Sequence, residues 1–308
     1  MSVDGILNID KPVGNTSLEI VNLVRRLSRQ RRVGHAGTLD PGATGVLPIC
    51  LGQATRIISF LIDAPKTYQA EVELGISTDT YDAEGKVTSR VDPSFLTREQ
   101  VEVALPSFLG SILQTPPMYS AVKHQGRRLY DLARAGIEVE RKRRRVHIFR
   151  LELLEWQPPR FTIEVECGKG TYIRSLVHDL GESLGCGSYL RNLVRLKSGL
   201  FNISDSLSIP QLEHSFHHGY WRNLLYPMDV VLEHWAVAIV SREKEHQIRN
   251  GCPLALDEQR SSDKALCRAY SVDGCFLAVL RFSPERGLWQ PEKVFSTTNS
   301  DLKASLQL

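Results

Sequence analysis

The sequence predicts an α+β fold, in which a mixed and largely antiparallel sheet is flanked by helices and followed by a small β-rich C-terminal domain. Three observations lead to this prediction. Residues 67–74 and 161–167 alternate between apolar and polar side chains, as half-buried strands do. Capping-box pairs that begin at Thr16 and Thr97 precede apolar residues at helical spacing. From about residue 235, short strand-like runs separated by turns replace the helical spacing. We therefore expect one domain over 1–230 and a second over 231–308.

The first expected elements are a short apolar strand at 6–9 and a helix that ends near Ser28. Thr16 and Glu19 have the spacing of a capping box, and the apolar residues that follow share one helix face: Ile20, Leu23, Val24 and Leu27. Five arginines then lie between residues 25 and 32. They suit a solvent-exposed helix C-terminus, where the helix dipole favours cations, and they equally suit contacts to phosphate.

A glycine-rich stretch, Gly34 to Gly45, follows and contains one carboxylate, that of Asp40. Glycine permits close backbone approach, while Pro41 fixes its own φ and favours an extended conformation for the residue before it. We therefore expect a rigid loop that holds this carboxylate outward, with His35 nearby. The alternatives are a plain turn and a phosphate-binding loop, but Ala43 stands where a phosphate-binding loop needs its lysine.

The strand expected at 67–74 places Tyr68 on the packed side of the sheet. There it is either a core residue or part of the wall of a cleft. A second capped helix is expected over 97–108, with an apolar face of Val101, Ala104, Leu105 and Phe108, and another strand over 146–154.

After the strand at 161–167, the sequence Gly168-Lys169-Gly170 breaks the alternation. A helix is expected next, and its inward residues are Ile173, Leu176, Val177, Leu180 and Leu184. Arg174 lies in the first turn of this helix. A cation at that end opposes the helix dipole, so Arg174 predicts a carboxylate or phosphate partner.

The segment from Met118 to Arg150 is strongly basic. It contains ten Lys or Arg and three acids, a net charge of +7, so the remainder of the chain carries −4 although the whole chain is only +3. A run such as 141–145 is often a solvated surface. Because this segment is internal and also contains Tyr119 and Tyr130, which could stack on bases, we favour an RNA-backbone contact surface.

Composition narrows the class of protein. Hydrophobic residues make up 42% and charged residues 24%, as in ordinary globular chains. The first residues have no signal-peptide pattern, and no apolar run is long enough to span a membrane. The six cysteines have no metal or redox spacing, so we expect reduced thiols and a cytoplasmic protein. His214, His217 and His218 lie in an expected linker without a second ligand cluster, so we expect no metal site.

The C-terminal part is expected to contain strands at 236–240, 276–282 and 293–296, with a turn at 250–253. This pattern, with residues 290–295, resembles a PUA domain, a small β-rich RNA-binding module. A plain β appendage is the alternative.

Several longer motifs occur in a fixed order along the chain. They are Asp-Lys-Pro at 10–12, Gly-His-Ala-Gly-Thr-Leu-Asp-Pro-x-Ala-Thr-Gly at 34–45, Thr-Tyr at 67–68, Thr-Asp-Thr-x-Asp at 78–82, Pro-Met-Tyr-Ser-Ala-Val-Lys at 117–123, Gly-Lys-Gly-Thr-Tyr-Ile-Arg at 168–174 and Leu-x-Arg at 193–195. Together they resemble the bacterial tRNA pseudouridine synthases of the pseudouridine synthase B family, which act on uridine 55 in the T loop. The resemblance covers roughly residues 3–230.

This resemblance implies roles for individual residues. Asp40 is the implied catalytic carboxylate, Arg174 its ion-pair partner, and Tyr68 the side chain that packs against the target base. Substrate contacts are implied for Lys11, His35, Tyr172, Leu193 and Arg195. RNA contacts are expected in the basic segment, which the family uses as a thumb over the RNA stem-loop, from Lys123, Arg127, Arg141, Arg143 and Arg144.

The resemblance also implies the reaction and its partners. Pseudouridine formation moves the attachment of uracil from N1 to C5 without a change of oxidation state, so no redox cofactor, phosphate donor or metal is expected. The expected substrate is the T stem-loop of tRNA, bound by a monomer without a guide RNA or a membrane. The uridine must be flipped out to reach a buried site, and His35 could fill the space that it leaves.

An aspartate is ionised at neutral pH, because its unperturbed pKa is about 3.9. Burial would raise the pKa of Asp40, and the facing Arg174 would hold it down. Three routes remain open: attack on the sugar C1′, attack on the base C6, and an elimination.

Two other functions compete. One is a non-catalytic tRNA-binding or RNA-chaperone protein on the same scaffold, which would not need Asp40, Tyr68 and Arg174 together. The other is a guide-dependent synthase acting on ribosomal RNA, whose relatives lack the basic segment.

Overall fold

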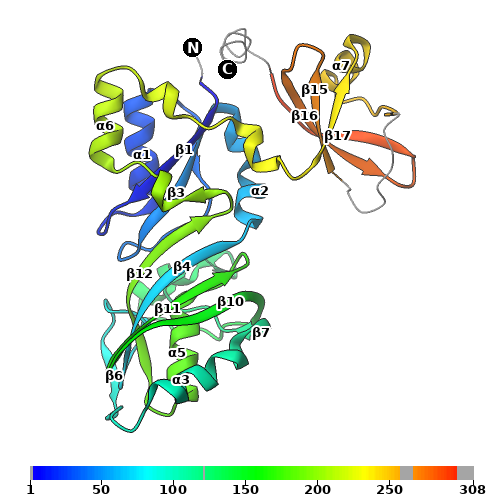
Figure 1. The fold of residues 1–308 in the computed structure, drawn as a ribbon. Coiled ribbons are helices and arrows are strands. Elements are labelled where there is room, and N and C mark those ends of the chain that lie inside the picture. The colour runs from blue at the N-terminus through cyan, green and yellow to red at the C-terminus, as the bar shows by residue number, and fades with distance from the viewer. Residues whose placement is uncertain (1–2, 121, 257–265, 297–308) are drawn as a thin grey trace.

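The computed structural model describes residues 3–120, 122–256 and 266–296 (Figure 1). Within these residues the larger sheet has nine strands, and its main path runs β1-β3-β12-β4-β11-β10-β7, with β2 beside β3 and β13 beside β12. Its strands are β1 (Gly5–Lys11), β2 (Val33–His35), β3 (Thr44–Leu51), β4 (Lys66–Leu74), β7 (Gly110–Gln114), β10 (Arg144–Gln157), β11 (Arg160–Cys167), β12 (Ser188–Ser198) and β13 (Phe201–Asn202). Neighbouring strands are antiparallel except β3 and β12, which are parallel. The prediction of a mixed, largely antiparallel sheet is confirmed.

Two short ribbons stand beside this sheet. One pairs β5 (Ile76–Thr78) with β6 (Val87–Arg90), and the other pairs β8 (Lys123–His124) with β9 (Arg127–Arg128) in the basic segment. The basic segment also contains α4 (Leu129–Arg134), whose Leu129 and Leu132 pack on Met118 in a small apolar cluster of their own.

Helices cover the apolar face of the sheet. They include α1 (Ser17–Ser28), α3 (Arg98–Ala104), α5 (Ile173–Ser183) and α6 (Ile209–His217). Both predicted capping boxes are present: Thr16 and Glu19 begin α1, and Thr97 and Gln100 begin α3. The inward residues of α5 are buried with those of β4 and β11 in one apolar core. His214 and His217, which we expected to lie in a linker, belong to α6, which contacts α1 and β1.

The parallel pairing of β3 with β12 depends on one glycine. Gly45 has φ +99°, and a Cβ placed there would lie 2.3 Å from the carbonyl oxygen of Arg195. Any side chain at position 45 would therefore push the two strands apart. This close approach brings the end of the glycine-rich loop next to residues 193–195.

The C-terminal part is a separate four-stranded sheet in the order β14-β15-β16-β17 (Figure 1). Its elements are β14 (Ala236–Val240), α7 (Arg242–Arg249), β15 (Leu266–Ser271), β16 (Phe276–Ser283) and β17 (Leu288–Val294). The β-rich prediction is confirmed, although β15 and α7 were not predicted and β17 begins earlier than expected. No helix among the described residues is long and apolar enough to cross a membrane.

Helix α2 (Ile58–Asp63) belongs to the larger part and packs against the C-terminal part. Its Leu61 belongs to a buried apolar cluster with Val279 of β16 and with Phe295, and the ring of Phe60 meets Trp235 edge-on at 5.0 Å. The other side of α2 faces the candidate site described below.

Candidate active site

The glycine-rich loop holds the Asp40 carboxylate in a tight turn. The amide of Ala43 donates to the Asp40 carbonyl at 3.1 Å, and Pro41 occupies the second position of this turn, which its fixed φ suits. The Pro41 carbonyl accepts from the Gly14 amide at 2.9 Å. Just before the turn, the buried Ser17 hydroxyl donates to the Leu39 carbonyl at 3.0 Å and accepts from the Leu39 amide at 2.9 Å. The loop is therefore fixed by groups from the start of α1 and the turn before it.

Lys11 hydrogen-bonds to the same loop and to the turn before α1. Its Nζ donates to the carbonyls of Pro12, Asn15 and Pro41, at 2.9, 2.7 and 3.3 Å, and its side chain is fully buried. Burial lowers the pKa of Lys11 to about 8. A direct contact from Lys11 to RNA, which we expected, does not fit this burial. The residue holds the loop instead.

Arg174 contacts both carboxylates of the site, those of Asp40 and Asp82. Its Nη2 lies 2.9 Å from Asp40 Oδ2 and 2.8 Å from the Tyr119 carbonyl, and its Nη1 lies 3.1 Å from Asp82 Oδ2. The Arg174 side chain is 7% exposed, whereas that of Asp40 is 46% exposed. A buried guanidinium therefore holds a carboxylate that still reaches the open side of the site. The anionic partner that the helix position of Arg174 predicted is present.

Asp40 and Arg174 line a cavity of about 250 Å³. Four more of the residues predicted for the site line it as well: Tyr68, Tyr172, Leu193 and Arg195. They come from β4, from the turn before α5 and from β12, so the cavity forms where distant segments of the sheet meet the loop. His35 is absent from the wall of this cavity.

The cavity wall combines a neutral phenol with a buried cation. Arg195 is 1% exposed, and its guanidinium donates to the Val46 carbonyl at 2.6 Å and to the Gly37 carbonyl at 3.2 Å. Burial raises the pKa of Tyr68 despite the Arg195 charge beside it, so Tyr68 is a neutral phenol at neutral pH. Burial, and then the Arg195 charge, lower the pKa of His35, so that imidazole is neutral too. The His35 Nδ1 atom is buried without a hydrogen-bond partner in the described part of the chain.

Three site residues escaped the sequence analysis. Asp82 is the second carboxylate on Arg174; it lies within the Thr-Asp-Thr-x-Asp motif, which had been assigned no role. Gln114 holds the turn before α5, since its Nε2 donates to the Tyr172 carbonyl at 2.9 Å and its Oε1 accepts from the Tyr172 amide at 2.8 Å. No pattern in the sequence signals this contact.

Lys66 is the third. It lines the cavity, is 6% exposed, and donates to the carbonyls of Leu61, Ile62 and Ala64 at the end of α2. Burial lowers the pKa of Lys66 to about 8. The sequence does contain a signal for Lys66: it is a cation two residues before Tyr68, and therefore on the packed side of the same strand.

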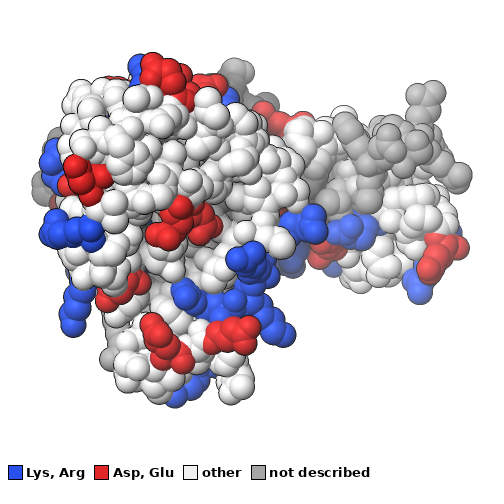
Figure 2. All heavy atoms as spheres, turned by 90° about the horizontal axis from the view of Figure 1, so that it is seen from below, with Lys and Arg blue, Asp and Glu red and all other residues white. Residues whose placement is uncertain are grey.

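The basic segment places one cation, Arg144, beside the cavity wall. Arg127, Arg143 and Arg144 are exposed, and the charge of Arg144 acts on Tyr172 in the cavity wall. Arg141 is partly buried and donates to the Pro116 carbonyl at 3.2 Å. The side chain of Lys123 lies outside the described residues. Figure 2 shows Lys and Arg side chains gathered in the middle of the face seen from below, in a band that continues toward the C-terminal domain.

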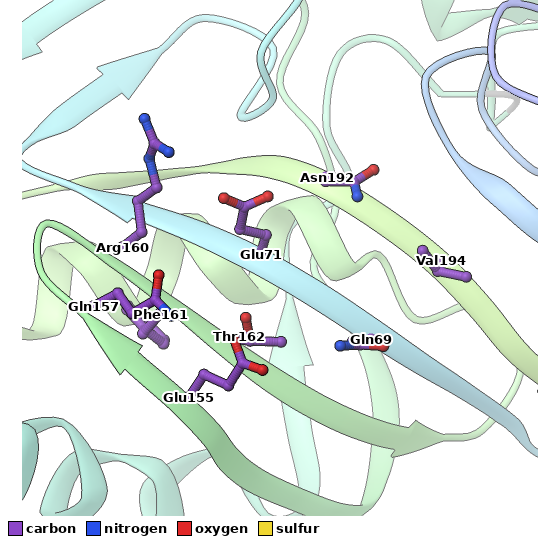
Figure 3. Close-up of a pocket in the computed structure, with 9 residues that line it drawn as sticks. All are labelled: Gln69, Glu71, Glu155, Gln157, Arg160, Phe161, Thr162, Asn192 and Val194. Carbon is purple, nitrogen blue, oxygen red and sulfur yellow. The ribbon is translucent and has the colours of Figure 1, made fainter.

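A second hollow, of about 260 Å³, lies on the open face of the sheet away from these residues (Figure 3). Its charged groups are Glu71 of β4, Glu155 of β10 and Arg160 of β11. Arg160 is already paired with Glu73 at 3.3 Å. None of the residues predicted for catalysis lines this hollow, and its carboxylates disfavour a phosphate backbone, so we place the active site at Asp40.

The chain matches known proteins over most of its length. Residues 25–173 match the model of the TruB family pseudouridylate synthase N-terminal domain, and residues 174–233 match the tRNA pseudouridylate synthase B C-terminal domain. The chain is similar to proteins named tRNA pseudouridine synthase B. The one from Dehalococcoides mccartyi is 47% identical over 95% of this chain and 97% of that protein, and the one from Clostridium acetobutylicum is 44% identical over 92% and 97%.

A solved structure described as a Cbf5-Nop10-Gar1 complex contains a chain with a similar fold. Its TM-score is 0.72 and its identity 26%, over 95% of this chain and 85% of that one.

Proposed function

The chain belongs to the TruB family of pseudouridylate synthases, and from this premise we propose that it converts uridine 55 in the T loop of tRNA to pseudouridine. The coarser statement, an isomerase that forms pseudouridine in tRNA, follows from the family and from the names of relatives that align over nearly the whole chain. The choice of position and the roles of the residues are our proposal.

The observation that carries the proposal is the contact between Asp40 and Arg174 at the wall of the cavity. Asp40 Oδ2 accepts from a buried guanidinium at 2.9 Å, and almost half of the Asp40 side chain remains open. A carboxylate in this position is ready to act as a nucleophile and split the exchange of a glycosidic bond into two steps. Because the protein already holds Arg174 in place, little reorganisation is needed when the charge on the carboxylate changes.

The rest of the wall suits a flipped pyrimidine. Tyr68 offers a neutral aromatic face, and Leu193 an apolar one, so the base would be held without a competing charge on those sides. A uridine within a folded loop must leave its stack to reach such a cavity. We propose that the neutral His35 occupies the space that the uridine leaves in the RNA.

We further propose that the chain acts on tRNA without a guide RNA or partner protein. The support is the basic segment, whose Arg127, Arg143 and Arg144 are exposed and whose Arg144 lies close enough to the cavity to act on Tyr172. These cations would hold the phosphates of the stem-loop while Asp40 reaches the base. All six cysteines are free thiols, in keeping with a cytoplasmic enzyme.

The test uses the purified chain alone with an unmodified tRNA transcript, followed by carbodiimide primer extension to map pseudouridine. A carbodiimide-dependent stop one nucleotide 3′ of position 55 is expected with the wild type, and none with a transcript that carries cytidine at position 55. Modification only elsewhere would refute the choice of position. Tight tRNA binding without any pseudouridine would instead favour the competing function, a tRNA-binding protein or RNA chaperone on the same scaffold.

A further inference from the structure

An aromatic stack outside the cavity joins two elements of the active site. The ring of Tyr81 lies 3.9 Å from that of His178, measured between centroids, with 10° between their planes. Tyr81 sits in the loop between β5 and β6 with φ +65°, a left-handed backbone that a bulky residue rarely adopts. Such a conformation persists where surrounding contacts enforce it.

This stack is adjacent in the chain to both groups that hold Arg174 Nη1. The residue before Tyr81, Thr80, offers its carbonyl at 3.4 Å, and the residue after it, Asp82, offers Oδ2 at 3.1 Å. On the other side, His178 lies one turn after Arg174 on α5, and residues four apart share one helix face. The ring pair and the ion pair therefore connect the same loop to the same helix face, side by side.

Other contacts fix the loop without fixing it to α5. The Thr78 hydroxyl donates to the Asp82 carbonyl at 2.8 Å, and the Leu190 amide of β12 donates to the Tyr81 carbonyl at 3.0 Å. The His178 Nδ1 is buried without a hydrogen-bond partner among the described residues. The imidazole thus contributes the face of its ring at this position, and not a hydrogen bond from that nitrogen.

We propose that Tyr81 and His178 are a positioning pair for the reaction. Their stack sets the distance between the β5–β6 loop and α5, so that Asp82 meets Arg174 in the orientation in which Arg174 holds Asp40. Neither ring lines the cavity at Asp40. This inference rests on the proposed function, because its effect is read as a rate of pseudouridine formation.

The experiment compares variants that keep a ring with variants that lose it. Tyr81→Phe and His178→Phe retain a stacking face, whereas Tyr81→Asn tolerates the left-handed backbone without a ring and His178→Ala removes the other partner. Single-turnover rates are measured at saturating tRNA, together with tRNA affinity and Tm. The two ring-loss variants are expected to be about three- to tenfold slower, with affinity within about twofold of the wild type, and the two Phe variants to match it.

A double variant tests whether Tyr81 acts through Asp82. If it does, Tyr81→Asn added to Asp82→Asn slows the reaction no further than Asp82→Asn alone. Three results would each overturn the proposal. They are a double variant whose rate loss is the product of the two single losses, rate losses in the Phe variants as large as those in the ring-loss variants, and wild-type rates in both Tyr81→Asn and His178→Ala. Failure of the proposed function is recognised separately, as an inactive wild type or an active Asp40→Asn variant.

Discussion

Replacing Arg174 with lysine tests whether the shape of the guanidinium matters as well as its charge. The side chain is 7% exposed and reaches two carboxylates and two carbonyls in different directions: Asp40, Asp82, Thr80 and Tyr119. A lysine keeps the positive charge, so neither carboxylate is left beside a neutral group. Its compact ammonium cannot span acceptors that a planar fork reaches from two nitrogens.

The expected loss follows from these contacts. Lysine gives up about two charge-assisted hydrogen bonds, each contributing about 1.5–3 kcal/mol when buried. Because Asp40 is 46% exposed, water screens part of that interaction, and we take a net cost of about 3 kcal/mol in the orientation of the carboxylate. If that orientation is needed in the transition state, the single-turnover rate falls about 100-fold. Affinity for tRNA should change less than about tenfold, since the buried Arg174 offers little surface to RNA.

The assay is a single-turnover measurement of pseudouridine formation with Arg174→Lys, beside Arg160→Lys as a matched control. Arg160 also pairs with a carboxylate, that of Glu73 at 3.3 Å, but it is 48% exposed and lines the second hollow, away from Asp40. The control should keep its rate, since exposed pairs contribute about 1 kcal/mol or less. A rate for Arg174→Lys within about threefold of the wild type would show that charge alone suffices and that the fixed geometry is irrelevant.

Four further predictions follow from the same structure. Asp40→Asn should abolish turnover while tRNA affinity stays within about tenfold, or ~1.4 kcal/mol; measurable pseudouridine would exclude a covalent role. Replacing all of 141–145 with serine should flatten the slope of log affinity against log salt by about two units, whereas parallel lines would mean that the run is only a soluble surface. The pKa of Lys11 in the folded chain is about 8, below its ordinary 10.5, because burial penalises the charged amine. Deprotonation relieves that penalty, so the contribution of Lys11 to the free energy of unfolding does not fall as pH rises from 8 to 10.5. The single-turnover rate should nevertheless fall above pH 8, as the amine loses a donor to the loop, and a flat rate profile across that interval would contradict this role. Thr16→Ala should lower the free energy of unfolding by about 1 kcal/mol in urea titrations without changing the rate, and no loss would mean that the capping box of α1 is unimportant.

Local patterns in the sequence predicted local structure well. The capping boxes at Thr16 and Thr97, the alternation through β4, and the loop that holds the Asp40 carboxylate outward all depend on neighbours within a few residues. Helix α6 carried a similar signal, a Ser208–Gln211 capping box, which the sequence analysis passed over.

What could not be predicted depends on partners that lie far away in the sequence. Nothing around Lys11 indicates that its ammonium meets three carbonyls and is buried, because hydrophobic patterning does not reveal hydrogen-bond partners. The same is true of Gln114, which holds the backbone of Tyr172 although it lies 58 residues earlier in the chain. The cation in the first turn of α5 was informative because a charge in an unfavourable place requires a partner, and Asp40 and Asp82 lie beside it.

The position of β12 has a consequence for how the chain folds during synthesis. This strand lies between β3 and β4, although it leaves the ribosome after both of them and after β11. The ~120 residues from the end of β4 to the end of β12 take on the order of 10 s to translate at about 5–20 residues per second. Throughout that interval the edge of β4 that β12 will cover has no partner, whereas β2 already pairs with part of the facing edge of β3. Unpaired edges are templates for aggregation. A nascent chain stalled within this interval should therefore depend on chaperones, and it becomes independent of them only once residue 198 has emerged.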